Sequence, residues 1–269
     1  MIKSIPSPFQ TPAQPGVLCA ILDASVDLDL HIHAEQAVAL FDNTPYAALQ
    51  QVGPVALLCP PDAASMHYAS ELLERADAGC VAYLENTQCF EQAVEHWRSL
   101  LTVSTDDAPA QLMRFFEPRW LEPLLHSLSE TERLQFLGPL SAMAWRNELG
   151  WRHLPRPVAQ SSPRQQAPGW LHVGRERQAK MEEQRLQVLA IRFAEDYRGV
   201  IDVPEPNAFV FRQLCAAQQA GYMQTAEQER WLRLALIKGD GSWRQFPHAQ
   251  LLARDDLSLG DKLDTLEQI

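Results

Sequence analysis

The sequence has no hydrophobic run that approaches the ~20 residues needed to span a membrane. Its first segment, Met1 to Gly16, holds several prolines and one lysine but not the continuous apolar core of a secretion signal. We therefore expect a cytoplasmic protein. The five cysteines are widely spaced and form no C-x-x-C pair, which favours buried free thiols in a reducing compartment over disulfides or a zinc site.

Sequence signatures of catalysis are absent as well. There is no G-x-S-x-G elbow, no H-E-x-x-H motif, no P-loop and no G-x-G-x-x-G after a strand. The run from Gly239 to Ser242 is predicted to be a turn rather than a phosphate cradle, because no strand precedes it. We expect a protein without catalytic activity, cofactor or metal. A hydrolase is the alternative, since a triad is defined by geometry and can be assembled from distant positions.

Basic residues are scarce in the first part of the chain. Residues 1–154 contain 19 acidic and 8 basic side chains, whereas the remainder contains 15 of each, so the first part carries the whole net charge of −11. This excess argues against nucleic acid as a partner, because phosphate binding requires clustered Lys and Arg. It favours a protein partner with basic patches, in an association that weakens with salt. Solubility alone is the other explanation of the charge.

Apolar runs alternate with helical patterns in this acidic part. Continuous apolar runs predict buried strands at 17–23, 55–59, 80–84 and 112–116, with a last strand or an extended arm at 143–151. Helical spacing of apolar residues predicts a helix at 64–76 and another that is capped by Asn86 or Thr87 and carries Phe90, Val94, Trp97 and Leu101. Two more helices begin at Pro118 and at the capping box of Ser129 and Glu132. The alternation predicts an α/β domain over 1–154, with a parallel or mixed sheet and helices on both faces.

Arg114 interrupts the apolar run at 112–116. In a central strand it would share one face with Leu112 and Phe116. A guanidinium in such a place needs a carboxylate or several carbonyls to replace its lost hydration. Arg114 is therefore either a structural tie or part of a recognition surface. The structural tie is favoured, because buried arginines are usually paired for architecture.

Polar and apolar residues alternate strictly from Ser25 to His33. If this stretch were extended, Asp27, Asp29, His31 and His33 would lie on one face and could bind a metal. Nothing in the sequence fixes the stretch as a strand. A solvated edge or an irregular loop is therefore the favoured interpretation.

The composition changes after the acidic part. Residues 155–169 are rich in Pro, Gln and Ser, which predicts a linker between domains. Beyond it, residues 170–269 show helical patterns alone and are predicted to form a small helical domain. Its long first helix, 175–197, should bury Met181, Leu186, Leu189 and Phe193. Further helices are expected at 207–220, from Thr225 to the turn at Gly239, at 247–253 and at 258–269. The helix from Thr225 should direct Trp231, Leu234 and Ile237 inward.

Several short motifs follow one another along the chain: LDAS from Leu22, ALFDNTPY from Ala39, VGPVALLCPP from Val52, HWRSLL from His96, MRFFEPRWLEPLL from Met113 and FLGP from Phe136. In this order they resemble the adaptor and chaperone family of bacterial type VI secretion, whose genes lie between spike-protein and toxin genes. The helical part resembles the region that often follows, in segments beginning at Gln218 and Leu251. Where the family usually has Arg-Phe-Tyr-Asp-Pro, this chain has Arg114-Phe115-Phe116-Glu117-Pro118.

The resemblance implies a non-catalytic cytoplasmic protein, monomeric by itself, that binds a particular toxin effector and assists its loading onto the VgrG spike. The two domains would hold different partners or enclose one, with the α/β domain expected to hold the effector. Asp23, Asp42, Arg114 and Glu117 are expected to form a polar cluster near the strand ends. The other motif residues that we assign to the partner-binding region are Phe41, Gly53, Pro54, Phe115, Phe116, Pro118, Arg119, Gly138 and Pro139.

Overall fold

The structure, a computed structural model, describes residues 1–11, 15–24, 36–61, 64–75, 78–157 and 166–268. The alternating stretch that contains Asp27, Asp29, His31 and His33 lies outside these residues. The chain divides into two compact units, unit 1 over Met1–Glu182 and unit 2 over Glu183–Ile269. None of the helices in the described ranges has the length and hydrophobicity to cross a membrane.

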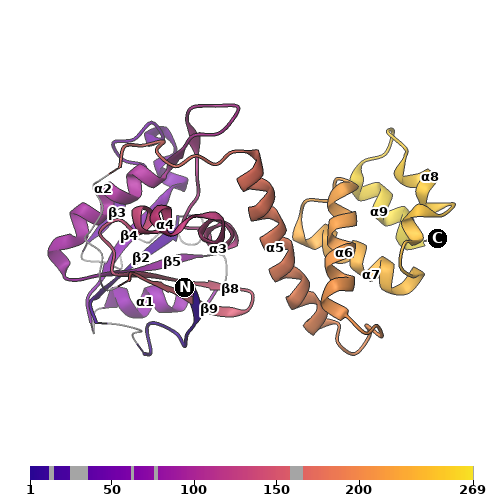
Figure 1. Ribbon diagram of the computed structural model, residues 1–269, viewed down its shortest axis with the longest axis horizontal. Helices are drawn as coiled ribbons and strands as arrows, with labels where there is room; N and C mark the ends of the chain where they lie inside the picture. The colour runs from indigo at the N-terminus through magenta and orange to yellow at the C-terminus, as the bar shows by residue number, and fades with distance from the viewer. Residues whose placement is uncertain (12–14, 25–35, 62–63, 76–77, 158–165, 269) are drawn as a thin grey trace. The chain divides into compact units, whose positions relative to one another are not determined.

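A sheet of antiparallel strands forms the middle of unit 1 (Figure 1). Its strand order across the described residues is β1-β9-β8-β5-β2-β4-β3. The strands are β1 (Lys3–Ser4), β2 (Val17–Asp23), β3 (Ala37–Ala39), β4 (Pro54–Cys59), β5 (Gly79–Leu84), β8 (Ala142–Asn147) and β9 (Gly150–Pro155). The strands expected at 17–23, 55–59 and 80–84 are confirmed as β2, β4 and β5.

The expectation of a parallel or mixed sheet is wrong, because every pair of neighbouring strands is antiparallel. The central strand β2 pairs with β4 on one side and with β5 on the other. Consequently β4 and β5 run parallel to each other, joined by α1 (Ala64–Leu73), but β2 lies between them. The strand-helix-strand pattern in the sequence is therefore present, although its two strands are not neighbours.

Helices cover both faces of the sheet. Figure 1 shows α1 on one face and α2, α3 and α4 on the other. Along β2, Cys19 and Ile21 enter the core under α2, α3 and α4, whereas Leu18, Ala20 and Leu22 enter the core under α1. Both faces of β2, β4, β5 and β8 are buried, which explains their continuous apolar runs although the strands are antiparallel. The helices on the larger core are α2 (Phe90–Leu100), α3 (Pro118–Ser127) and α4 (Glu130–Leu137).

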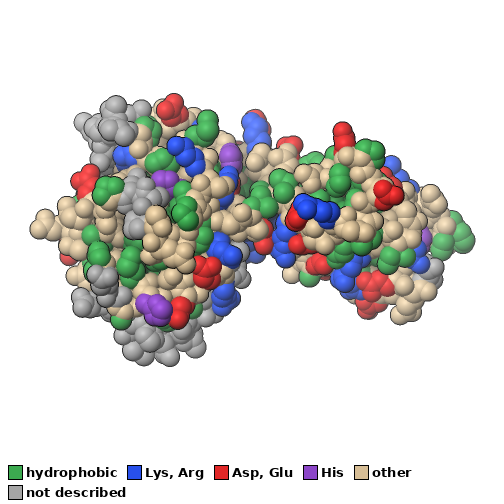
Figure 2. Space-filling view, turned by 90° about the horizontal axis from the view of Figure 1, so that it is seen from below, with side chains coloured by type: hydrophobic (Ala, Val, Ile, Leu, Met, Phe, Trp, Pro, Cys, Tyr) green, Lys and Arg blue, Asp and Glu red, His purple; other side chains and the backbone are tan. Residues whose placement is uncertain are grey.

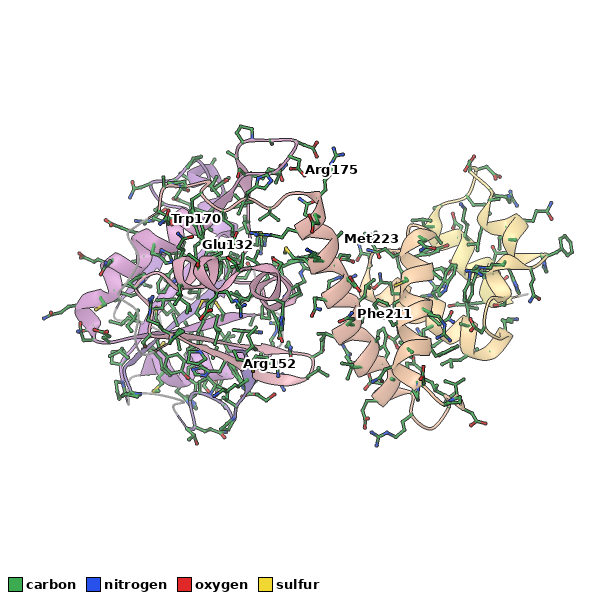
Figure 3. The ribbon with its side chains drawn as sticks, viewed as in Figure 1. Glu132, Arg152, Trp170, Arg175, Phe211 and Met223 are labelled. Carbon is green, nitrogen blue, oxygen red and sulfur yellow. The ribbon has the colours of Figure 1, made fainter. Side chains whose placement is uncertain are left out.

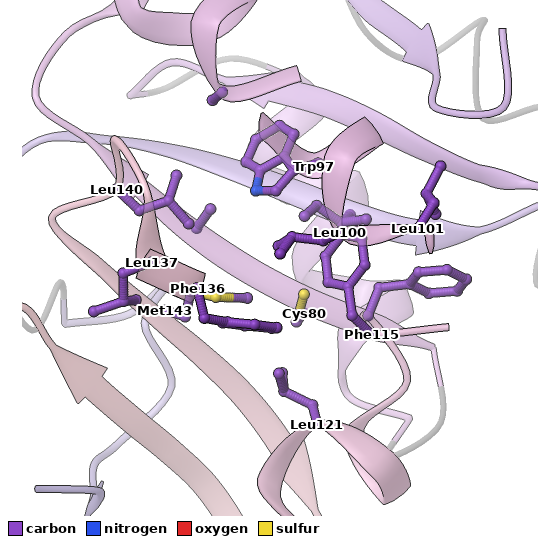
Figure 4. Packing of buried hydrophobic residues seen from close by; sticks show 14 of the residues in the cluster. Cys80, Trp97, Leu100, Leu101, Phe115, Leu121, Phe136, Leu137, Leu140 and Met143 are labelled. Carbon is purple, nitrogen blue, oxygen red and sulfur yellow. The ribbon is translucent and has the colours of Figure 1, made fainter. Parts of the chain in front are cut away.

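The larger core contains Trp97, Phe115 and Phe136, which are all fully buried (Figure 4). The presence of both Phe115 and Phe116 in this core shows that the predicted central strand at 112–116 is wrong. Only Gln111–Leu112 is a strand, β7, and it pairs with β6 (Thr102–Val103) in a separate small sheet. Phe115 and Phe116 follow each other in sequence and pack edge to face, with ring centroids 5.7 Å apart, in the same core. A strand would send them to opposite faces, so the chain turns here instead and enters α3.

The predicted last strand or arm at 143–151 is a hairpin. Strand β8 pairs with β5, and β9 returns beside β8 with Asn147 opposite Gly150. The helix expected from Pro118 is confirmed as α3, with Pro118 in its first turn. The capping box is also confirmed, because the Ser129 side chain accepts from the Glu132 N–H while the Glu132 carboxylate accepts from the Ser129 N–H.

Unit 2 consists of helices only, among the residues described. Helix α5 (Arg175–Asp196) crosses the boundary between the units, and its Leu186, Leu189 and Phe193 are buried as expected. The other helices are η2 (Ala47–Val52) and η3 (Thr87–Cys89) in unit 1, and α6 (Pro206–Gln219), α7 (Thr225–Lys238), η4 (Ser242–Arg244), α8 (His248–Leu252) and α9 (Leu259–Gln268) in unit 2. Charged and hydrophobic side chains are interspersed on the face of unit 2 seen in Figure 2.

Ile237 is not on the buried face of α7. Its exposure is 76%, whereas Trp231 and Leu234 are buried as expected. Six residues beyond Trp231, Ile237 lies ~240° further round the helix, on the side opposite the buried Leu232 and Ala235.

The predicted linker at 155–169 falls within unit 1. Pro155 ends β9, and residues 158–165 are outside the described part of the chain. Leu171 and Val173, which follow the linker, are buried in the larger core of unit 1. The boundary between the compact units therefore lies further along the chain than the predicted linker. The role of residues 155–169 as a linker between domains stays a prediction.

Substituting Gly138 tests how tightly α4 is packed. Gly138 has φ of +55°, and a Cβ there would overlap the imidazole of the buried His96. Gly150, with φ of +110° and open space around it, is the matched control. We expect Gly150→Ala to lower the free energy of unfolding by about 1 kcal/mol and Gly138→Ala by about 3 kcal/mol, because the ring must also move. Native-state hydrogen exchange at the β5 amides measures both. Equal losses would contradict the overlap.

Candidate functional site

Arg114 joins three separate parts of unit 1. Its Nη2 donates to Asp23 Oδ2 and its Nε donates to Glu117 Oε1. The other oxygen of Glu117 accepts from Arg119 Nε at 2.7 Å. Arg114 is 36% exposed, while the side chains of Asp23 and Glu117 are only 10% and 8% exposed. Two nearly buried carboxylates thus depend on a guanidinium that still reaches the surface.

The local chain conformation brings these groups together. Asp23 is the last residue of β2, and Glu117 is the N-cap residue of α3. The Glu117 N–H donates to the Arg114 carbonyl at 3.1 Å, which closes the turn between β7 and α3. A carboxylate at the N-terminus of a helix is also favoured by the helix dipole. The predicted cluster therefore forms around Asp23, Arg114 and Glu117.

Asp42 is the fourth residue of the predicted cluster. Within the described residues, no hydrogen bond or ion pair joins its side chain to Arg114, Asp23 or Glu117. It follows Phe41 in the turn after β3 and is half-buried. The structure therefore brings together three of the four residues.

A groove with a volume of about 260 Å³ lies beside Arg114. Its lining combines apolar side chains with the charged side chains of Arg114, Glu117 and Arg119. The lining residues are Val103, Thr105, Gln111, Leu112, Met113, Arg114, Glu117, Arg119, Trp120, Val173, Gln178 and Met181. They come from β6, β7, the start of α3, the segment before α5 and the first turns of α5, all within unit 1.

The start of α5 is held against unit 1 by polar contacts. Glu132 Oε1 accepts from Arg177 Nη2 at 2.7 Å, and Asp106 Oδ2 accepts from the Arg175 N–H at 2.7 Å. Figure 3 shows Glu132 on α4 and Arg175 at the first turn of α5. The bond from the Arg175 N–H is the leading cause that lowers the pKa of Asp106. These contacts fix the α5 wall of the groove, which Gln178 and Met181 line.

A serine, a histidine and a carboxylate are connected near this wall. His172 Nδ1 lies 3.3 Å from Ser104 Oγ, and His172 Nε2 lies 3.1 Å from Asp106 Oδ1. A catalytic triad uses the opposite ring nitrogens, with Nε2 on the serine and Nδ1 on the carboxylate. Asp106 is also occupied by the Arg175 N–H. These three residues are better explained as part of the polar contacts that hold the start of α5.

Most of the remaining motif residues lie in the core or in turns of unit 1, and only Arg119 lines the groove. Phe41, Phe115 and Phe116 are buried in the larger core. A Cβ at Gly53 would overlap the Phe41 ring, and one at Gly138 would overlap His96. The other placements are as follows: Pro54 begins β4, Pro118 is buried in the first turn of α3, Arg119 is exposed and lines the groove, and Pro139 is half-buried after α4.

Glu122, a buried acid on α3, is not among the residues predicted from the sequence. Its Oε2 accepts from Trp145 Nε1 at 3.0 Å and from Asn147 Nδ2 at 2.6 Å, and its Oε1 lies 3.1 Å from Arg152 Nη2. Figure 3 shows Arg152 on the β8–β9 hairpin. Burial by itself raises the pKa of Glu122, but the hydrogen bonds from His126, Trp145 and Arg152 outweigh it and lower the pKa. The sequence signal for this buried acid was a glutamate between Leu121 and Leu125, on the apolar face of the predicted helix.

The cysteines carry no sign of reactivity. Cys19, Cys59 and Cys80 are buried free thiols, as expected, while Cys89 and Cys215 are half-buried. Burial raises the pKa of Cys59 to about 11. Across the described part of the chain, no group of three or more His, Cys, Asp and Glu side chains is placed to hold a metal ion.

Comparison with protein families matches residues 18–135 to a domain of unknown function, DUF4123. The matched stretch runs from β2 into α4 and contains Asp23, Arg114 and Glu117. Comparisons with curated proteins and with solved structures found no match.

Removing the Arg114 guanidinium distinguishes a structural tie from a surface charge. We expect Arg114→Ala to lower the free energy of unfolding by about 3 kcal/mol, because the nearly buried Asp23 loses this counter-charge and Glu117 is left with the exposed Arg119. Arg119→Ala is the control, and since that side chain is 66% exposed we expect a change within about 0.5 kcal/mol. Urea denaturation measures both variants. A small and equal effect of the two substitutions would show that Arg114 is not a tie.

The pKa of Glu122 predicts a loss of stability in acid. Because its folded-state pKa is lowered below the ordinary value of 4.5, ionised Glu122 stabilises the fold above this value, and the contribution is lost as the pH falls through the folded-state pKa. Urea unfolding at a series of pH values from neutral to acid should show a steeper loss for the wild type than for Glu122→Gln. The same slope for both proteins would mean that Glu122 is not stabilised as a carboxylate.

Proposed function

We propose that this protein is a cytoplasmic adaptor or chaperone of type VI secretion, which binds a toxin effector and assists its loading onto the VgrG spike without catalysing a reaction. The ordered set of motifs from Leu22 to Pro139 carries this proposal. The match to the domain of unknown function covers all of these motifs except the last, FLGP, and includes the charged cluster around Arg114.

The groove beside Arg114 has the chemistry of a protein-binding site. Met113, Trp120 and Met181 supply apolar surface, and methionine side chains adapt readily to the shape of a bound group. Arg114 and Arg119 supply directed hydrogen-bond donors at the rim. Tryptophan and arginine are the residues that most often contribute strongly to protein association. We place the effector in this groove.

The acidity of the first part of the chain supports a partner with basic patches. The excess of 19 acidic over 8 basic residues lies in residues 1–154, which contain most of unit 1. Complementary charge accelerates association and is screened by salt.

A hydrolase is the second candidate, because Ser104, His172 and Asp106 are connected in one hydrogen-bonded series. A fluorophosphonate probe that labels Ser104, with loss of labelling in His172→Ala, would favour this function. The adaptor proposal predicts no labelling of Ser104.

Purification of the tagged protein from the bacterium that encodes it tests the partners. We expect a toxin and a VgrG spike protein to co-purify at low salt and to be reduced at high salt, because complementary charges contribute to the association. Mass spectrometry identifies the proteins. Recovery of the protein without a toxin or a spike protein under both conditions would contradict the proposal.

Placing a charge in the groove tests the site. We expect Met113→Glu to weaken binding of the co-purified effector by about tenfold or more, since it buries a carboxylate against the apolar lining. Leu149→Glu is the matched control, because Leu149 is 46% exposed on the β8–β9 hairpin and does not line the groove. Isothermal titration calorimetry measures both, after circular dichroism shows that each variant is folded. Equal weakening by the two substitutions would exclude the groove as the site.

A further inference from the structure

Unit 2 has an aromatic notch at its surface, between α7, η4, α8 and α9. The notch has a volume of about 20 Å³, room for about one water molecule. Its lining residues are Trp231, Leu234, Ala235, Lys238, Ser242, Trp243, His248 and Leu266. Two large hydrophobic side chains are exposed in the same segments, Ile237 at 76% before Lys238 and Phe246 at 82% between η4 and α8. Phe246 lies three residues after the lining residue Trp243, and exposed apolar side chains grouped in this way are a feature of interaction sites.

The indole of Trp231 has an unused hydrogen-bond donor. Trp231 is 3% exposed and packs on Trp243 with ring centroids 5.3 Å apart. Its Nε1–H has no acceptor among the residues that the structure describes. Buried indole N–H groups usually have a partner. This N–H is itself buried, so a partner at the surface would contact the half-buried ring of Trp243 rather than the Trp231 donor.

The rim of the notch is cationic. Lys238 lines it, and Arg244 follows Trp243 in η4. Both side chains are exposed, and neither forms an ion pair within the described ranges. The acid closest in sequence, Asp240, accepts from Gln213 at 2.8 Å and lies 3.7 Å from Arg212. The two cations are therefore available to an acidic partner.

We propose that this surface, the Trp231 surface, docks an acidic amphipathic segment of another protein. The surface consists of Trp231, Lys238, Trp243, Arg244 and Phe246. Apolar side chains of the segment cover Trp243 and Phe246, and its Asp and Glu side chains face Lys238 and Arg244. This binding site goes beyond the proposed function, because it lies wholly in unit 2 and does not involve the groove of unit 1.

Selection of random displayed peptides on the full-length protein tests the surface. We expect enriched peptides that combine Leu, Phe or Trp with several Asp or Glu residues. The strongest one, labelled for fluorescence anisotropy, should bind Phe246→Ala and Lys238→Glu with about tenfold lower affinity than wild type, the loss typical of an important contact residue. Binding should also weaken as salt is added.

Matched controls and a charge reversal distinguish specific binding at this surface from non-specific binding. Val200→Ala removes another exposed apolar side chain of unit 2, and Arg198→Glu reverses another exposed charge. Neither substitution should change the affinity for the peptide. A peptide with Lys in place of its acidic residues should bind Lys238→Glu more tightly than wild type.

Three results would overturn the inference. The first is that the enriched peptides lack acidic residues, or that none of them depends on Phe246 and Lys238 for binding. The second is equal weakening by the Val200 and Arg198 controls. The third is a dimer in light scattering that Phe246→Ala abolishes, since a second copy of the chain would then occupy the surface. Because the peptide assay contains neither toxin nor spike, its outcome is independent of the proposed loading function.

Discussion

The guanidinium of Arg114 pairs with two nearly buried carboxylates of unit 1. Asp23 ends the interior strand β2, and Glu117 begins α3, so the charge of Arg114 connects the sheet to the helix that covers it. Without it, Asp23 would lose this counter-charge and Glu117 would be left with Arg119. The position of α3 follows from this pairing, and with it the position of Trp120 on the groove wall and of Glu122 in the core.

The other polar clusters of unit 1 also serve to position its elements. Glu122 joins α3 to the β8–β9 hairpin through Trp145, Asn147 and Arg152. Asp106 and Glu132 hold the first turn of α5. Each cluster fixes an element that frames or supports the groove. Such an arrangement suits a protein whose function is to present a shaped surface to another protein.

The sequence predicts the elements of the chain better than their arrangement. Apolar runs identified β2, β4 and β5, and the capping box of Ser129 and Glu132 located α4, because both signals are local. The direction of strand pairing was wrong, since a sheet buried on both faces produces the same apolar runs in parallel and antiparallel strands. The run at 112–116 was misassigned because apolar content cannot distinguish a central strand from a turn that places Phe115 and Phe116 in one core.

Part of the site was predictable in the same sense. An arginine in an apolar run requires acidic partners, and two of the three predicted ones, Asp23 and Glu117, contact Arg114. That the Glu122 carboxylate would accept hydrogen bonds from β8 and β9 was not predictable, because these contacts join residues far apart in the chain. The groove itself combines side chains from β6, β7, α3 and α5, and only the folded chain brings them together.

The proposed loading function is tested by deleting the gene and measuring delivery into a sensitive competitor of the toxin expected to co-purify with the protein. We expect delivery to be lost while other toxins of the same secretion apparatus are still delivered. We also expect the wild-type gene and Leu149→Glu to restore delivery, whereas Met113→Glu should not. Normal delivery of the toxin without the gene would contradict a role in loading.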